Sequence, residues 1–204
     1  MANNLVITIG REFGSGGHAI AKKLSELTGL KMYDKDLIKL AAKNSGYSED
    51  VLRDIDETAT NSLLYTLSMG ANHHLPFVTG GHDIPITDRA FIICSQIIKE
   101  LAEKESCIIV GRCADSILRE HKNLLTVFIH ADLEQRIERI CEYEKCSHNE
   151  AANIIKKADR KRSTYHNYYA DTKWGNAKAY DLCINSKIGI EKAAEIIKFF
   201  SEHM

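Results

Sequence analysis

The chain has 204 residues, of which 44% are hydrophobic, enough for one sizeable core. Its 27 lysines and arginines nearly balance 28 aspartates and glutamates, and the formal net charge is -1 at pH 7. This composition excludes a disordered or fibrous chain, and it gives no net positive charge that would recruit nucleic acid or an acidic membrane.

No transmembrane or secretory signal is evident in the sequence. The longest apolar runs are far below the roughly 20 residues of a membrane-spanning helix, and residues 1–4 include no basic side chain. We therefore expect a cytoplasmic protein that binds neither membranes nor nucleic acid. None of the six cysteines forms a Cys-x-x-Cys pair, so we expect reduced core cysteines, including Cys94 and Cys183, and no metal site.

The apolar pattern predicts alternating strands and helices. Residues 5–9 are almost continuously apolar, which is typical of a strand covered on both faces in a parallel sheet. A glycine-rich turn follows, and apolar residues then recur at helical spacing as far as Gly29, which is placed to end the helix. Later strands are predicted at residues 31–33, 107–110, 124–129 and 180–184. Later helices are predicted at residues 37–42, 48–69, 88–101, 114–118, 133–143, 150–162 and 190–200.

This order predicts an α/β fold, a doubly wound parallel sheet of about five strands with helices on both faces. The helical segments at residues 36–70 and 145–175 contain no sheet strand. We expect them to lie as flaps at the carboxyl edge of the sheet, where ligands of open α/β sheets bind. The helices at residues 48–70 also offer a surface for a second copy, so a homodimer stays open.

The loop after the first strand carries most of the functional inference. It reads Gly10-Arg11-Glu12-Phe13-Gly14-Ser15-Gly16-Gly17-His18 and opens directly into a helix. Such a loop points backbone N–H groups into one concavity at the positive end of the helix dipole, which suits a phosphate. The phosphate-loop pattern GxxxxGK(S/T) fits only in part, because Arg11 stands at its first glycine, Gly17 at its lysine and His18 at its hydroxyl residue. The alternative is an ordinary strand-to-helix turn with convenient glycines.

Several segments resemble the cytidylate kinase-like family, and the likeness spans nearly the whole chain. They are Ile7-Thr8-Ile9-Gly10-Arg11-Glu12-Phe13-Gly14-Ser15-Gly16-Gly17, Tyr33-Asp34-Lys35-Asp36-Leu37-Ile38 and Ile109-Val110-Gly111-Arg112-Cys113-Ala114-Asp115. The likeness continues through Asp159-Arg160-Lys161-Arg162 and Tyr180-Asp181-Leu182-Cys183-Ile184-Asn185. Within this family the lysine-free Gly-Ser-Gly-Gly loop is usual.

The resemblance implies a P-loop fold of the nucleoside monophosphate kinase type. It implies one domain over residues 1–204, with an acceptor-binding helical flap at residues 36–87 and a lid at residues 145–175. True cytidylate kinases transfer the terminal phosphoryl group of ATP to CMP or dCMP with Mg²⁺. We therefore expect a kinase that uses ATP and Mg²⁺ and binds small nucleotide substrates.

The resemblance also implies roles for individual residues. The expected nucleotide-binding residues are Gly14, Ser15, Gly16, Gly17, His18 and Asn185. The expected acceptor-binding residues are Arg112, Asp115, Lys35, Lys39 and Asp34, and Asp34 or Asp115 can also hold magnesium through water. The expected catalytic residues are the lid arginines Arg160 and Arg162, together with Arg11, which can reach over the loop. The structural alternatives are an ion pair for Arg112, a helix cap for Asp115 and a solvated helix face for the lid arginines.

Departures from the pattern of true cytidylate kinases concern activity rather than fold. Gly17 lacks the lysine that bridges the β- and γ-phosphates, His18 lacks the hydroxyl for magnesium, and Val110 stands where a carboxylate precedes Gly-Arg. In that Gly-Arg-Asp segment, Cys113 also replaces the aspartate. Arg11 or Lys22 can restore a positive charge near the phosphates. Two functional classes therefore stay open. One is a phosphotransferase with a lysine-free loop, and the other is a catalytically silent nucleotide- or anion-binding domain that acts as a ligand-driven switch or partner surface.

Overall fold

A computed structural model describes residues 4–34, 37, 39 and 86–204. The chain divides into two compact units, one of residues 1–34 and 98–204 and the other of residues 35–97. Lys35, the predicted helix at residues 48–69 and nearly all of the predicted flap at residues 36–87 lie outside the described residues. The flap, and the dimer surface expected on it, therefore stay predictions.

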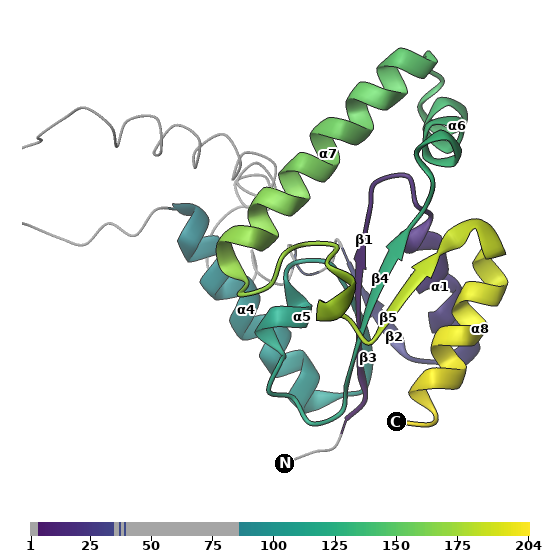
Figure 1. The fold of residues 1–204 in the computed structure, drawn as a ribbon. Helices are drawn as coiled ribbons and strands as arrows, with labels where there is room; N and C mark the ends of the chain where they lie inside the picture. The colour runs from purple at the N-terminus through teal and green to yellow at the C-terminus, as the bar shows by residue number, and fades with distance from the viewer. Residues whose placement is uncertain (1–3, 35–36, 38, 40–85) are drawn as a thin grey trace, which may run out of the picture. The chain divides into compact units, whose positions relative to one another are not determined.

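The first unit is built on one five-stranded parallel sheet (Figure 1). Its strands are β1 (Val6–Arg11), β2 (Lys31–Tyr33), β3 (Cys107–Val110), β4 (Leu124–His130) and β5 (Leu182–Asn185). They lie in the order β2-β3-β1-β4-β5. Ile9 of β1 is in register with Val110 on one side and Val127 on the other. The predicted central position of the first strand is confirmed.

Helices cover both faces of this sheet. Helices α1 (Gly17–Thr28) and α8 (Ile190–Ser201) pack side by side on one face, and the short α5 (Ala114–Ile117) lies on the other (Figure 1). The core joins β1, β3 and β4 to Ile20 and Leu24 of α1 and to Ile197 of α8. Helix α1 ends at Gly29 (φ 72°), whose amide donates to the Ser25 carbonyl, as the sequence predicts. Helix α4 (Ile86–Lys104) spans the boundary between the two units.

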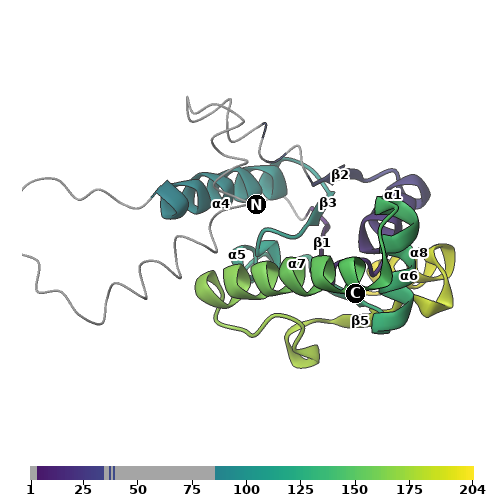
Figure 2. The same cartoon turned by 90° about the horizontal axis from the view of Figure 1, so that it is seen from above.

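A helical hairpin follows β4. It consists of α6 (Leu133–Glu144) and α7 (His148–Tyr169), which share a small core of Ile137, Ile140, Ala151 and Ile155. A capping box of Ser147 and Glu150 begins α7. Seen from above, α7 runs across the carboxyl ends of the strands (Figure 2).

Two sequence expectations are corrected. Helix α7 continues to Tyr169, beyond the predicted end at residue 162, and the rings of Tyr165 and Tyr168 both pack edge-on against that of Tyr169. Cys183 was expected in the core but is exposed, because alternate side chains of the edge strand β5 face outward and Ile184 takes the inward position. None of the described helices is both long enough and apolar enough to cross a membrane.

Candidate phosphate loop and acceptor pocket

The glycine loop between β1 and α1 exposes backbone amides at the helix N-terminus. Gly14 (φ 77°) and Gly16 (φ 81°) adopt left-handed conformations, and Gly16 is the N-cap of α1. Among the described residues, no hydrogen-bond acceptor meets the amides of Gly16, Gly17 or His18. Since first-turn amides lack partners within their own helix, these groups are available to a phosphate.

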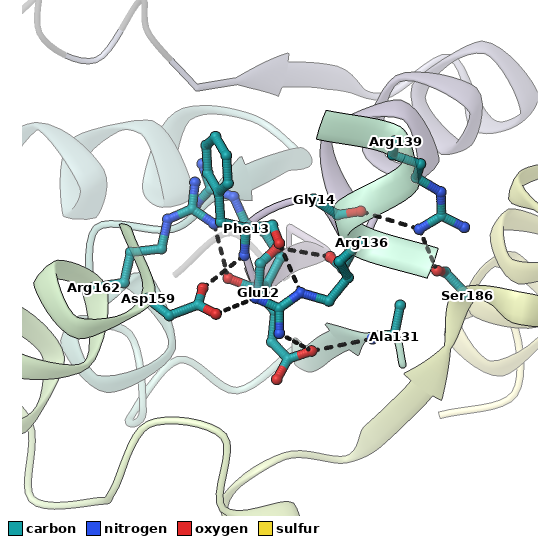
Figure 3. A network of polar contacts seen from close by, with 11 residues as sticks. Glu12, Phe13, Gly14, Ala131, Arg136, Arg139, Asp159, Arg162 and Ser186 are labelled. Carbon is teal, nitrogen blue, oxygen red and sulfur yellow. Dashed lines mark hydrogen bonds and ion pairs between the residues drawn. The ribbon is translucent and has the colours of Figure 1, made fainter. Parts of the chain in front are cut away.

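A buried arginine of α6 holds the start of this loop (Figure 3). Arg136 is 5% exposed, and its Nε donates to the Phe13 carbonyl at 2.8 Å. Its guanidinium pairs with Glu12 at 3.1 Å and also with Asp159 of α7. Asp159 in turn accepts the Phe13 amide at 2.7 Å, and Glu12 accepts the Ala131 amide at 3.1 Å. The loop is thus tied to both helices of the hairpin.

The middle of the loop is held by hydrogen bonds to neutral acceptors rather than by ion pairs. Arg139 donates to the Gly14 carbonyl at 3.1 Å and to the Ser186 hydroxyl at 3.2 Å (Figure 3). The hydroxyl of Ser15 donates to the Glu12 carbonyl at 2.8 Å. The side chain of Asn185 accepts the Lys187 amide at 3.0 Å. The predicted nucleotide-binding residues Ser15 and Asn185 therefore already hold local structure with their side chains.

The side chain of Arg11 explains why residue 17 is glycine. A Cβ placed on Gly17 would lie 2.7 Å from the Cβ of Arg11, closer than real Cβ contacts allow. The Arg11 guanidinium continues past Gly111, where a Cβ would lie 2.1 Å from one of its nitrogens, and reaches Asp34 at 3.4 Å. Arg11 thus fills the space that a side chain at position 17 would occupy.

Asp34 joins the loop to β2. Its Oδ2 lies 2.8 Å from Nδ1 of His18, and its Oδ1 lies 3.4 Å from Arg11. The structure therefore brings together Arg11, His18 and Asp34, which the sequence assigned to catalysis, nucleotide binding and acceptor binding.

A strained turn follows β3. Gly111 (φ 78°), Arg112 (φ 60°) and Cys113 (φ 53°) are all left-handed, and residues other than glycine adopt that region at a cost of about 1–2 kcal/mol each. Such strain persists where surrounding structure enforces it and gathers at functional sites. The turn is therefore a candidate binding element by its backbone as well as by its arginine.

One pocket in the first unit collects many of the predicted residues. It is lined by Gly10, Arg11, Gly111, Arg112, Cys113, Asp115, Arg162, Tyr165, His166, Trp174 and Tyr180. Arg162 also donates to the Arg11 carbonyl at 3.1 Å and lies over the Phe13 ring. Arg160 is exposed and does not line this pocket, and Lys39 belongs to the second unit. Four of the predicted site residues line this pocket with their side chains, namely Arg11, Arg112, Asp115 and Arg162.

Asp115 does not cap α5. The N-cap is Cys113, which makes no side-chain cap bond, and Asp115 instead lies 2.8 Å from Nε2 of His166 in α7. His166 was not among the predicted site residues, because the helix was expected to end before it and in fact continues to Tyr169. His166 and Asp115 are both buried in the pocket wall.

Two further groups that line the pocket, the Cys113 thiol and the Tyr180 hydroxyl, also carry acidic protons. Burial raises the pKa of the Cys113 thiol well above its usual value, and the Asp115 carboxylate raises it further. Burial likewise raises the pKa of the Tyr180 hydroxyl, again with a contribution from Asp115. Both groups stay protonated at neutral pH, so neither provides an anionic nucleophile.

The strain at Arg112 gives a test by substitution. Arg112→Gly and Arg112→Ala both remove the guanidinium, but only glycine adopts the left-handed region freely. We expect the glycine variant to be the more stable by about 1 kcal/mol in urea unfolding. The same pair at Glu195, an exposed residue inside α8, is the control, and there glycine should be the less stable by about 1 kcal/mol. Equal stability of the two Arg112 variants would contradict the strain.

Comparisons with known proteins agree with this architecture. The chain is similar to a crystal structure of an uncharacterized protein from Eubacterium ventriosum, with 31% sequence identity and a TM-score of 0.71, covering 98% of this chain and 100% of that one. It is also similar to shikimate kinase from Bacteroides thetaiotaomicron, at 13% identity and a TM-score of 0.55, over 97% of this chain and 98% of that one. A gluconokinase from Sinorhizobium meliloti matches at 14% identity and a TM-score of 0.52, over 100% of this chain and 97% of that one.

The two named kinases share the fold alone with this chain at such low identity. A search of curated proteins gives no match. The sequence pattern of the cytidylate kinase-like family matches residues 6–188, a range that includes the glycine loop, the Gly111-Arg112 turn and α7. The chain therefore belongs to the cytidylate kinase-like family, and its fold is that of the P-loop kinases.

Proposed function

We propose that the protein transfers the γ-phosphoryl group of ATP to CMP, dCMP or another small phosphorylated acceptor. The main support for the proposal is that Arg11 contacts the glycine loop and also lines the pocket. Arg11 packs against Gly17 at the open amides of the glycine loop, and it also lines the pocket that contains Arg112 and Arg162. A nucleotide phosphate on the loop and an acceptor in the pocket would therefore meet at the same guanidinium.

Phosphoryl transfer depends mainly on positioning and on compensation of negative charge. In our proposal the amides of Gly16, Gly17 and His18 bind the ATP phosphates, and Arg11 supplies the cation that the loop lacks at position 17. Arg112 forms bidentate hydrogen bonds to the acceptor's phosphate. Arg162, on the helix that crosses the sheet edge, adds charge compensation in the transition state.

Magnesium fits this site only with the help of the nucleotide. No cluster of three histidine, cysteine or acidic side chains that could hold a metal is found within the described part of the chain. Mg²⁺ commonly takes one or two carboxylates together with phosphates and waters. We propose that Asp34, linked to the loop through His18, holds the ion through water. The bound ion would neutralise part of the charge on the β- and γ-phosphates.

The decisive experiment pairs binding with turnover. Thermal shift with ATP, CMP and Mg²⁺ reports binding, and coupled detection of ADP over a panel of CMP, dCMP, UMP and AMP reports transfer. We expect ATP to raise the melting temperature and at least one acceptor to give turnover above the background of ATP hydrolysis. ATP binding without transfer to any acceptor would overturn the proposed phosphotransferase activity and favour a nucleotide-driven switch.

Arg112→Ala tests the acceptor side of the proposal. Loss of a charge-assisted bidentate contact is expected to raise the KM for the acceptor roughly 10- to 100-fold, while the affinity for ATP stays within about twofold. Arg119→Ala, which removes an exposed arginine outside the pocket, is the matched control. Equal weakening of ATP and acceptor binding would contradict this role of Arg112.

A further inference from the structure

The pocket wall contains a buried acid–histidine pair that the proposed transfer to a phosphate does not use. The side chains of Asp115 and His166 are 12% and 6% exposed, and Oδ2 of Asp115 lies 2.8 Å from Nε2 of His166. The two residues come from α5 and α7, and both line the pocket that also contains Arg112. The pair therefore belongs to the side of the site assigned to the acceptor.

The surroundings of the ring determine where its proton lies. Nδ1 of His166 is buried and meets no hydrogen-bond partner among the described residues. A proton on Nδ1 would be a buried donor without an acceptor, which is costly. Nε2 therefore carries a proton, and Nε2–H donates to Asp115.

This hydrogen bond occupies only one oxygen of Asp115. His166 is the carboxylate's hydrogen-bond partner, and no hydrogen bond from the described residues engages Oδ1. Because Asp115 lines the pocket, its second oxygen is available to a ligand, and the histidine fixes the carboxylate's orientation. Nδ1 of His166 is itself buried, so the histidine acts through Asp115 and does not reach the ligand.

A carboxylate at this place distinguishes between two kinds of acceptor. A phosphate that accepts a phosphoryl group is already an anion, needs no base, and is repelled by a neighbouring carboxylate. A hydroxyl group needs a base to take its proton as its oxygen attacks phosphorus. We propose that the acceptor is a phosphorylated alcohol whose phosphate binds Arg112 and whose hydroxyl is the nucleophile, with Asp115 as general base and His166 as its positioning residue. This inference rests on the proposed function and narrows its acceptor.

The proposed step balances without a further reactant. The hydroxyl oxygen forms a bond to the γ-phosphorus of ATP while the bond from that phosphorus to the β,γ-bridging oxygen breaks. The hydroxyl proton moves to Oδ1 of Asp115, and the products are ADP and a new phosphate ester. Transfer to the acceptor's phosphate would instead form a phosphoanhydride and leave Asp115 without a part in the reaction.

The linkage in the product is the first test. The full-length protein is incubated with ATP, Mg²⁺ and, separately, CMP, dCMP, glycerol 3-phosphate and ribose 5-phosphate, each of which offers both a phosphate and a hydroxyl. Phosphorus NMR separates a new phosphomonoester from a phosphoanhydride such as CDP. We expect a phosphomonoester as the enzymatic product.

The second test measures the kcat of Asp115 and His166 variants with the acceptor that gives turnover. Asp115→Asn is expected to lower kcat at least 100-fold, the usual contribution of a general base, with the Kd for ATP unchanged. His166→Phe is expected to lower kcat roughly 10- to 100-fold through misplacement of the carboxylate. His166→Gln, which retains an N–H donor, should recover part of that loss. Thermal melting and ATP binding establish that each variant is folded, and the histidine pair provides the test if Asp115→Asn does not fold.

Each outcome either supports or overturns the inference. A phosphomonoester product, loss of kcat in Asp115→Asn and recovery by His166→Gln support the inference. A phosphoanhydride product, or Asp115→Asn with a kcat within threefold of the parent, overturns it and leaves the proposed phosphotransferase intact. ATP binding with no transfer to these acceptors or to UMP and AMP overturns the proposed function and this inference with it.

Discussion

Replacing Arg136 with methionine is expected to lower the free energy of unfolding by about 3 kcal/mol. The substitution removes the cation from between the carboxylates of Glu12 and Asp159, whose side chains are only 25% and 19% exposed. It also removes the donor from the Phe13 carbonyl. Removing one partner of a buried ionic network costs more than the network contributes as a whole, because the remaining charges have lost both water and counter-ion.

For a chain of this size the change corresponds to a fall in melting temperature of roughly 6 to 12 °C. Urea unfolding and thermal melting both measure it. Arg139→Met on the same helix is the control, because within the described part of the chain Arg139 donates to a carbonyl and a hydroxyl and not to a carboxylate, and it should cost about 1 kcal/mol. If the two variants were equally stable, the ionic network would not be what holds the loop to the hairpin.

The importance of Arg136 was not apparent from the sequence, although one signal pointed to it. An arginine in an amphipathic helix usually lies on the solvated face. Arg136, however, lies four residues before Ile140, which places both on one face, and Ile140 packs in the core of the hairpin. The carboxylates that allow a guanidinium to be buried there come from the loop and α7, both distant in sequence.

Only some of the pocket residues could be predicted from the sequence. Asp159, Arg162 and His166 are spaced by three and four residues, so one face of α7 presents all of them toward the loop and the pocket. The pattern could be followed only as far as Arg162, because a run of aromatic and polar residues predicted the end of the helix. The sheet was easier to predict, since strands buried on both faces are apolar whatever their neighbours are.

The missing lysine was evident from the sequence, whereas its structural cause was not. A glycine at position 17 is compatible with an inactive loop and equally with a loop whose cation comes from elsewhere. The distance of 2.7 Å between the Arg11 Cβ and a Cβ on Gly17 shows that the two side chains exclude each other, so the glycine has a steric cause. An arginine at position 11 and a lysine at position 17 are alternatives for the same space.

Arg11→Met is therefore expected to reduce kcat by about 100- to 1000-fold, the usual effect of removing one well-placed donor to a developing charge. The reduction should appear in kcat more than in the KM for the acceptor, because the contact strengthens as charge moves in the transition state. Steady-state kinetics with the acceptor that gives turnover measure both quantities. Arg119→Met, outside the pocket, is the control. Unchanged turnover would return Arg11 to the role of an ion-pair partner for Asp34.

A double substitution tests whether the cation has moved between the two positions. Gly17→Lys alone should disrupt the loop, because its Cβ meets the Cβ of Arg11 at 2.7 Å. Combined with Arg11→Gly, it removes that clash and completes the GxxxxGK part of the phosphate-loop pattern. We expect the double variant to melt higher than Gly17→Lys and to recover at least tenfold of the turnover lost in Arg11→Gly. A double variant no more active than Arg11→Gly would mean that a lysine at position 17 cannot replace the Arg11 guanidinium, which comes from the end of β1.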